Sequence, residues 1–215
     1  DYDNDGFLDL FVTGLGQPGL LYHNNGNGTF TRVTDSAAGS LVTESTNGPG
    51  CAWGDYDNDG FLDLFIARIG AKALLFHNNG NGTVSRIDSG ILVNDGAAPT
   101  QSFSAVWGDY NNDGFLDLIV ANGGGVPSLN QNNFLYLNNG NNNSWIKVRC
   151  VGTVSNRSAL GTKVRVKATI GGKTVWQLRE VSHGSGWSSA PLEAHCGLGD
   201  ATNVETLRIE WPSGT

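Results

Sequence analysis

Short apolar runs, separated by turns rich in glycine and asparagine, make up most of the chain. In its best-defined stretch, an apolar run at 61–67 is followed by runs at 73–77 and 83–87. The last two flank an Asn-Gly turn, which is a strong signal for a β-hairpin. No segment shows sustained helical periodicity, so the pattern predicts an all-β chain.

An acidic motif recurs at a fixed interval along the chain. The sequence Asp-Tyr-Asp-Asn-Asp-Gly-Phe-Leu-Asp at 1–9 returns unchanged at 55–63, and it returns with one Asp-to-Asn change at 109–117. Both intervals are 54 residues. Self-similarity at this period is typical of solenoids and propellers, in which each repeat is one supersecondary unit.

A second, asparagine-rich motif keeps the same phase. Leu-Tyr-His-Asn-Asn-Gly-Asn-Gly-Thr at 21–29 is matched at 75–83, and a third copy at 135–140 arrives six residues late, after an insertion within 122–133. Four short strands in about 50 residues form one propeller blade. We therefore expect three propeller-type four-stranded blades at about 1–50, 51–104 and 105–143.

The predicted ring of blades is incomplete. Propellers usually need about 4–8 blades to close, and this sequence holds three repeats. The first repeat also lacks the strand that 51–54 supplies to the second. We expect the ring to be completed by residues on the N-terminal side or by another chain, since an open blade edge invites pairing.

A different β pattern follows the repeats. Residues 161–170 alternate between apolar and polar, a Gly-Gly turn follows, 173–178 returns as a strand, and 204–211 forms a further strand. The chain is thus expected to contain a repeat domain at 1–143 and a second, β-sandwich-like domain at 144–215.

Charge is unevenly distributed along the chain. The formal net charge is −7, yet 11 of the 20 acidic residues lie in the three acidic motifs. The acidity therefore indicates metal ligands rather than a generally acidic surface. No basic run is present, so nucleic acid is not an expected partner. No window of about 18 apolar residues predicts a membrane span.

The acidic motifs have the donor pattern of calcium loops. Oxygen-bearing side chains stand at loop positions 1, 3, 5 and 9, and position 6 is always glycine, which permits a left-handed turn. Calcium prefers about 6–8 hard oxygen ligands, and the backbone carbonyl of position 7 can add one. The predicted ligands are Asp1, Asp3, Asp5, Phe7 and Asp9; Asp55, Asp57, Asp59, Phe61 and Asp63; and Asp109, Asn111, Asp113, Phe115 and Asp117.

Other metal-loop types fit the motif less well. Position 12 is apolar rather than Glu, so the loops are not EF-hands. The loops contain no His or Cys, which argues against zinc. We expect about three Ca²⁺ ions, one in each repeat, holding the blades together. Binding should be weakest in the third loop, because Asn111 removes one carboxylate.

These residues resemble the FG-GAP/VCBS repeats of integrin-α-like propellers, whose Asp-x-Asp-x-Asp-Gly-x-x-Asp loops bind calcium, over about residues 1–143. The remainder resembles the ASPIC/UnbV domain that follows such repeats in bacterial proteins and in the cartilage acidic protein family. The matching segments are 144–149, 155–161, 179–182, 184–187, 196–199 and 211–214. Because the family usually continues past the segment that matches 211–214, the resemblance implies that the second domain is truncated at its C-terminal end. The resemblance implies secreted or cell-surface proteins involved in adhesion and matrix contact, and it implies no established reaction.

No residue pattern in the sequence predicts an enzyme. The segment 183–186 places a Ser near a His, but it reads as a glycine-rich turn. His23 and His77 recur in phase with the repeat, which indicates architecture rather than catalysis. Three cysteines leave at least one unpaired; Cys150 and Cys196 could form a disulfide.

The sequence therefore predicts an extracellular or cell-surface calcium-binding module for adhesion, matrix or surface assembly, with a protein or glycan ligand. One alternative is a carbohydrate-binding lectin, in which Trp53 and Trp107 stack on sugar rings, although their repeat phase favours core packing. Another is a structural subunit of an extracellular polymer that self-associates through open blade edges.

Overall fold

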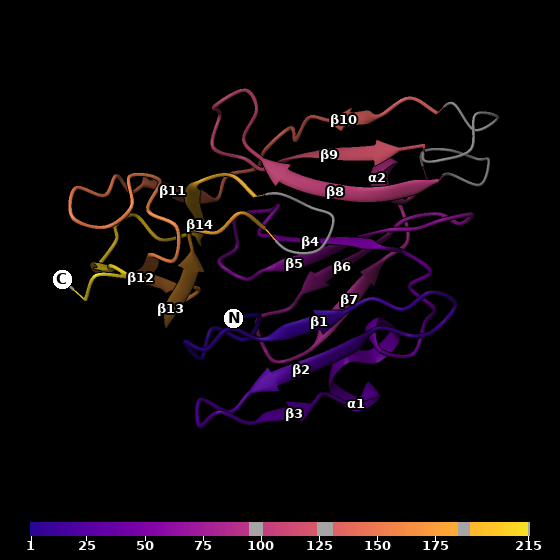
Figure 1. Ribbon diagram of the computed structural model, residues 1–215, viewed down its shortest axis with the longest axis horizontal. Coiled ribbons are helices and arrows are strands. Elements are labelled where there is room, and N and C mark those ends of the chain that lie inside the picture. The colour runs from indigo at the N-terminus through magenta and orange to yellow at the C-terminus, as the bar shows by residue number, and fades with distance from the viewer. Residues whose placement is uncertain (95–100, 124–130, 185–189, 215) are drawn as a thin grey trace.

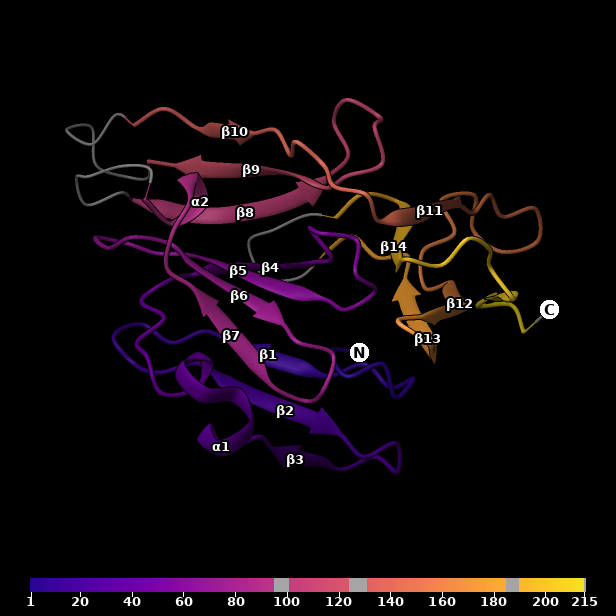
Figure 2. The ribbon, with the colours of Figure 1, turned by 180° about the vertical axis from the view of Figure 1, so that it is seen from behind.

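The computed structural model describes residues 1–94, 101–123, 131–184 and 190–214. Within these ranges the chain forms five antiparallel sheets, which confirms the all-β prediction. The helical pieces are single turns: α1 Asp35–Ala38, η1 Gly39–Leu41 and α2 Ile91–Asn94. Three sheets are stacked in chain order, and the C-terminal strands lie beside one end of the stack (Figures 1 and 2). Residues 185–187 of the 184–187 segment lie outside the described residues.

Each of the three stacked sheets corresponds to one sequence repeat. The strands are β1 Leu10–Val12, β2 Leu20–Asn24 and β3 Phe30–Arg32 in the first; β4 Gly50–Gly54, β5 Asp63–Ala67, β6 Leu74–Asn78 and β7 Val84–Ile87 in the second; and β8 Ser102–Gly108, β9 Asp117–Asn122 and β10 Phe134–Tyr136 in the third. The middle sheet has the four strands expected of a blade, in the order β4-β5-β6-β7. The first lacks the β4 equivalent, as the sequence predicted. The third has three strands among the described residues, because the chain after β10 passes into the C-terminal domain.

The middle blade is buried on both faces. Along β5, Leu64 and Ile66 join the core shared with the first blade, whereas Phe65 and Ala67 join the core shared with the third. Side chains alternate between the two faces of a strand, so a strand between two sheets must be apolar at every position. Burial of each large side chain contributes roughly 1.5–3 kcal/mol.

The outer blades expose the matching positions. Leu10 and Val12 on β1 are 49% and 41% exposed, and Ile119 on β9 is 44% exposed. The equivalent side chains of β5 are covered by the neighbouring blades. The two outer faces of the stack therefore present the apolar positions that a neighbouring blade covers in its middle.

The two repeated tryptophans belong to the cores between blades. Trp107 is 6% exposed and stacks on Tyr56 of the preceding blade, with ring centroids 6.1 Å apart. Trp53 packs edge-to-face on Phe11 at 6.3 Å. The structure thus gives Trp107 a place in the core, as its repeat phase predicted, rather than a free face for a sugar ring.

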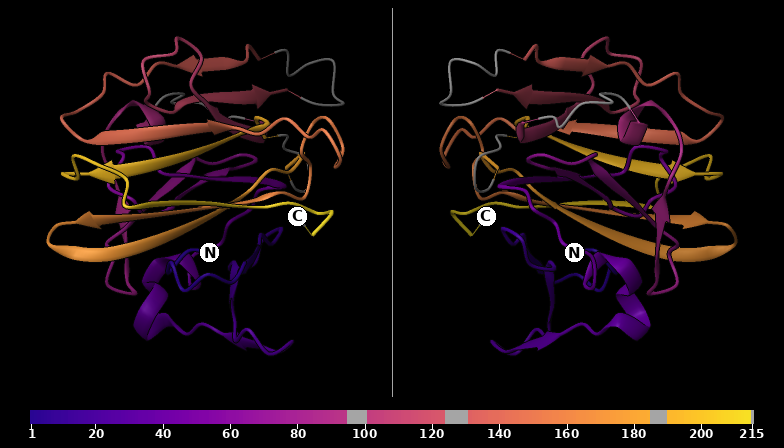
Figure 3. Two further views of the ribbon diagram at one scale, coloured as in Figure 1. Left: turned by 90° about the vertical axis from the view of Figure 1, so that its left-hand side faces the viewer. Right: turned by 90° about the vertical axis from the view of Figure 1, so that its right-hand side faces the viewer.

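The C-terminal domain is a small two-layer β structure across the end of the stack (Figure 3). One layer pairs β11 Ser144–Arg149 with β14 Glu193–Gly199, and the other has the order β13 Lys173–Glu180, β12 Lys163–Ile170 and β15 Thr206–Glu210. Val164 and Val166 of β12 pack with Cys196 and Leu198 of β14 in one core. This arrangement confirms the expected sandwich-like second domain.

Cys51, Cys150 and Cys196 are all free, so the pairing of Cys150 with Cys196 that the sequence left open is not formed. Cys196 pairs with Ile146 on β11, whereas Cys150 follows the last residue of that strand. Four residues of strand span roughly 13 Å. A disulfide needs Cα atoms closer than about 7 Å.

The sequence predicted no membrane span. Over the residues that the structure describes, none of the helices is long and apolar enough to cross a bilayer.

Candidate metal centres

The three acidic loops lie at one end of the blade stack. Loop 1 (residues 1–9) precedes β1, loop 2 (55–63) joins β4 to β5, and loop 3 (109–117) joins β8 to β9. Neighbouring loops are hydrogen-bonded to one another. The amide of Asn4 donates to the Gly60 carbonyl at 3.0 Å, and Asn58 donates to the Gly114 carbonyl at 3.1 Å. The end of the stack is therefore a continuous row of acidic loops.

Within each loop, the carboxylates fold the backbone inward. In loop 2 the N–H of Gly60 donates to Asp55 at 2.9 Å, that of Tyr56 to Asp63 at 3.2 Å and that of Phe61 to Asp59 at 2.9 Å. Loops 1 and 3 repeat these three bonds. The glycine at position 6 has φ of 94°, 96° and 89° in the three loops, a left-handed backbone that only glycine adopts without strain.

The structure gathers the predicted ligands of loops 1 and 2. Ligand oxygens of Asp1, Asp3 and Asp9 lie within 4.8 Å of one another, and the same holds for Asp55, Asp57 and Asp59. Asp5 forms a similar group with Asp3 and His23, and Asp63 forms one with Asp57 and His77. Asp109, Asn111, Asp113 and Asp117 share the loop fold, but within the described residues they form no such carboxylate group.

The phenylalanines at position 7 have a packing role in every loop. The rings of Phe7, Phe61 and Phe115 lie against the glycine of the following hairpin turn. A Cβ on Gly80, for example, would come within 2.6 Å of the Phe61 ring. Each loop is thus held onto its own hairpin. The role of the three backbone carbonyls as metal ligands stays a prediction.

Burial makes the carboxylates of loop 2 unfavourable as bare anions. Asp55 and Asp63 are 1% and 0% exposed. Desolvation and the neighbouring Asp57 raise the pKa of Asp59 to about 7, and desolvation raises the pKa of Asp63 to about 6. The pKa of Asp55 is raised well above its usual value for the same reasons. A cation among these oxygens would remove this penalty, so the donor set fits a hard dication.

Two histidines lie beside the carboxylates of loops 1 and 2, and neither was predicted as a ligand from the sequence. His23 Nδ1 lies 3.0 Å from Asp3 and 3.6 Å from Asp9. His77 Nδ1 lies 3.1 Å from Asp63 and 3.4 Å from Asp57. The motif itself contains no His, but folding brings a His from outside the motif next to the carboxylates of both loops. The available signal was their common position, 14 residues after the last loop Asp in both repeats.

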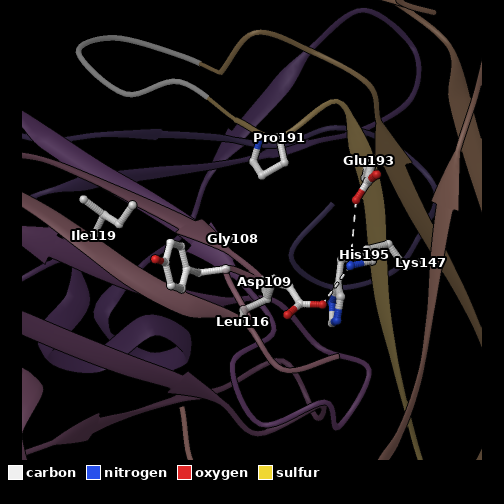
Figure 4. A pocket seen from close by; sticks show the side chains of 9 residues that line it. Gly108, Asp109, Leu116, Ile119, Lys147, Pro191, Glu193 and His195 are labelled. Carbon is white, nitrogen blue, oxygen red and sulfur yellow. Dashed lines mark hydrogen bonds and ion pairs between the residues drawn. The ribbon is translucent and has the colours of Figure 1, made fainter. Parts of the chain in front are cut away.

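Loop 3 neutralises its charge in a different way. Lys147, from β11, places Nζ 2.8 Å from Asp109 Oδ2 and 3.9 Å from Glu193 (Figure 4). Desolvation raises the pKa of Asp109, but the bonds from Lys147 and Gly114 outweigh it and the pKa is lowered. The amide of Asn111 donates to Asp113 at 2.7 Å. Loop 3 therefore carries less uncompensated charge than the other two.

The same ion pair borders a pocket between the third blade and the C-terminal domain. The pocket has a volume of about 200 Å³, and Tyr110, Ile119 and Pro191 supply much of its apolar wall. In Figure 4, Lys147 and His195 stand on the side of the pocket opposite Ile119. The pocket lies at the joint between the domains and touches loop 3 through Asp109.

The C-terminal domain reaches the position-1 carboxylate of every loop. The N–H of Leu178 donates to Asp1 at 3.2 Å, the N–H of Gly197 donates to Asp55 at 3.1 Å, and Lys147 binds Asp109. The second domain thus supplies one donor to each loop, from three different strands.

Backbone carbonyls of the loops receive further donors. Gly199 N–H donates to Asn58 O at 2.7 Å, His195 lies within hydrogen-bond distance of Gly114 O at 2.9 Å, and Arg165 donates to Gly6 O at 3.3 Å. The acidic loops are therefore the surface on which the two domains meet.

In the absence of metal, stability should fall as the pH rises from about 5 to 8. Asp59 and Asp63 have folded pKa values of about 7 and 6, so the folded state binds more protons than the unfolded state above their ordinary value of 3.8. The hydrogen bond to Asp63 raises the pKa of His77 from 6.5 to about 9. The stability that protonated His77 gives to the folded state is therefore also lost as the pH rises through about 9. Thermal melts in chelator across this range test the expectation. Asp59→Asn should flatten the slope, and a melting temperature that rises with pH would contradict it.

Protein-family comparisons match both halves of the chain. The FG-GAP-like repeat model matches residues 1–66 and 55–120, the FG-GAP repeat model matches 103–143, and the ASPIC and UnbV model matches 152–215. The matches follow the predicted order of repeats and second domain and confirm that resemblance.

Curated relatives carry the same name in three vertebrates. The chain is 27% identical to cartilage acidic protein 1 of Mus musculus and to that of Homo sapiens, in each case over 227 aligned residues and the whole of this chain. It is 28% identical to the Xenopus tropicalis protein over 55% of the chain. The chain spans about a third of the length of the mouse and human relatives, 33% and 32%.

Proposed function

The chain belongs to the FG-GAP repeat family, and we propose that it is a calcium-stabilised interaction module rather than an enzyme. The observation that carries this proposal is the burial of several carboxylates around one point in loop 2, where Asp55 and Asp63 are almost inaccessible to solvent. Carboxylates in such numbers are stable as anions only near a compensating cation. They accept backbone N–H groups, which suits structural ligands better than acid–base groups.

The fold already gathers part of each proposed ligand set, because oxygens of Asp1, Asp3 and Asp9, and of Asp55, Asp57 and Asp59, lie within 4.8 Å of one another. The ion of loop 2 would be held by Asp55, Asp57, Asp59 and Asp63 with the Phe61 carbonyl, and that of loop 1 by Asp1, Asp3, Asp5 and Asp9 with the Phe7 carbonyl. A bound Ca²⁺ supplies two positive charges that offset the carboxylates. Asp55 accepts from Gly60 of its own loop and from Gly197 of the C-terminal domain with one oxygen, Oδ2. Asp1 accepts from Gly6 with Oδ1 and from Leu178 of the C-terminal domain with Oδ2. Loop shape and domain docking are thereby linked.

We propose a location outside the cell or at its surface, with a protein or glycan ligand in a matrix or adhesion setting. Support comes from the family and from the relatives, whose name refers to cartilage, a tissue rich in extracellular matrix. The chain spans about a third of the mouse and human relatives, so we propose only the class of partner, a protein or a glycan.

Titration calorimetry with Ca²⁺ on metal-free protein tests the proposal. We expect two tighter sites and a weaker third, because loop 3 has Asn111 and the Lys147 ion pair. Asn111→Asp should strengthen the third site about tenfold or more, since one further carboxylate joins it. Asn203→Asp adds the same charge on an exposed residue of the C-terminal domain, outside the loops, and should leave all three affinities unchanged. Absence of Ca²⁺ binding to the unmodified chain would exclude the proposed function.

A further inference from the structure

We propose that His23 and His77 make loops 1 and 2 mixed nitrogen–oxygen sites that accept a first-row divalent transition ion of the Zn²⁺ class. Loop 3, which has Leu137 at the corresponding position, offers oxygen ligands alone. This inference rests on the proposed function in one respect, namely that the loops hold a cation. It differs in the metal and in the ligands, because both histidines lie outside the calcium motif.

The ligand geometry of the two histidine clusters supports the assignment. One nitrogen of His23 and carboxylate oxygens of Asp3 and Asp5 lie within 4.8 Å of one another, as do those of His77, Asp57 and Asp63. Ligands at about 2.0–2.2 Å from an ion are separated from each other by roughly 3.0–3.5 Å. The Nδ1–oxygen distances of 3.0, 3.1 and 3.4 Å to Asp3, Asp63 and Asp57 fall in that range.

A second observation concerns the Nδ1 atom of His23. Its Nδ1 is buried and has no hydrogen-bond partner among the described residues, although Asp3 Oδ2 lies 3.0 Å away. A buried polar atom without a partner is costly, so it calls for an explanation. A metal ion between the imidazole nitrogen and the carboxylates satisfies both groups.

The chemistry of the donors sets the class of ion. Imidazole is a preferred ligand of zinc and of other first-row ions, whereas calcium takes oxygen ligands. The three repeats form an internal comparison, because His23 and His77 are replaced by Leu137 in the repeat that also has Asn111. The difference in ligand type should therefore appear as a difference in stoichiometry between metals.

The test is calorimetric titration of the whole metal-free chain with Zn²⁺ and, separately, with Ca²⁺. We expect two Zn²⁺ sites in the unmodified chain. His23→Leu and His77→Leu should each weaken one site at least about tenfold, and the double variant should weaken both. Leucine is the residue that the third repeat carries at this position, so the change fits the fold. Ca²⁺ binding should persist in all variants, since the loop oxygens are intact.

Two controls keep the result decisive. The double variant retains His183, His195 and all three cysteines, so adventitious Zn²⁺ binding will be visible in it. Leu137→His combined with Asn111→Asp gives loop 3 the nitrogen and the carboxylate of the other two repeats, at a position 137 that is 55% exposed. This double change should add a third Zn²⁺ site, and it decides the matter if a leucine variant does not fold. Equal Zn²⁺ binding by the unmodified chain and the double variant overturns the inference, as does no Zn²⁺ binding at all. Ca²⁺ binding without Zn²⁺ binding leaves the proposed function standing, whereas loss of both refutes the two together.

Discussion

Removal of divalent cations should lower the melting temperature of the chain by about 10–20 °C. Each site that is saturated at about 100 times its dissociation constant adds roughly 2.7 kcal/mol to the folded state. Two such sites, in loops 1 and 2, supply about 5 kcal/mol. For a chain of 215 residues, each kcal/mol corresponds to roughly 2–4 °C.

The physical reason for this large effect is the burial of the ligands. Asp55 and Asp63 are inaccessible to solvent and lie beside Asp57 and Asp59, so like charges are forced together when the cation is removed. Adding Ca²⁺ back should restore the melt. Asp59→Asn should shrink the chelator effect, whereas Asp88→Asn, with a side chain that is 73% exposed, should leave it unchanged. An identical melt with and without chelator would show that the loops do not need an ion.

Gly197→Ala should destabilise the protein by about 2–6 kcal/mol and separate the C-terminal domain from loop 2. A Cβ at Gly197 would lie 2.3 Å from Asp55 Oδ2 and 2.4 Å from the Asn58 Cα, and the backbone atom cannot swing aside. Overpacking of this kind costs about 1–3 kcal/mol, and loss of a donor to a buried carboxylate costs about as much again.

Denaturant unfolding measures the loss of stability, and amide exchange shows where it occurs. The N–H groups of Gly197 and Gly199, which donate to loop 2, should exchange faster in the variant. Gly108→Ala is the matched control at the same joint, because its Cβ would meet only Pro191 at an ordinary 3.6 Å. Equal stability of the two variants would mean that the domains do not depend on this contact.

Much of the repeat domain was predictable because its determinants are local. A fixed interval, an Asn-Gly turn and alternating apolar residues define a blade without reference to distant parts of the chain. The same holds for the loop ligands, since Asp55, Asp57, Asp59 and Asp63 stand within nine residues and converge through glycine and hydrogen bonds of their own loop. Such features depend on residues that are close together in the sequence.

What only the tertiary structure decided is the environment of those ligands. His77 approaches Asp63 because a hairpin carries β6 back beside β5, and Lys147 reaches Asp109 because a strand of the other domain crosses the loop. Packing also showed that Cys150 and Cys196 stand too far apart to bond. By itself, the sequence determined the number of acidic loops and their oxygen donors. The nitrogen neighbours, the compensating charge and the docking of the second domain depend on contacts between distant residues, which no local pattern encodes.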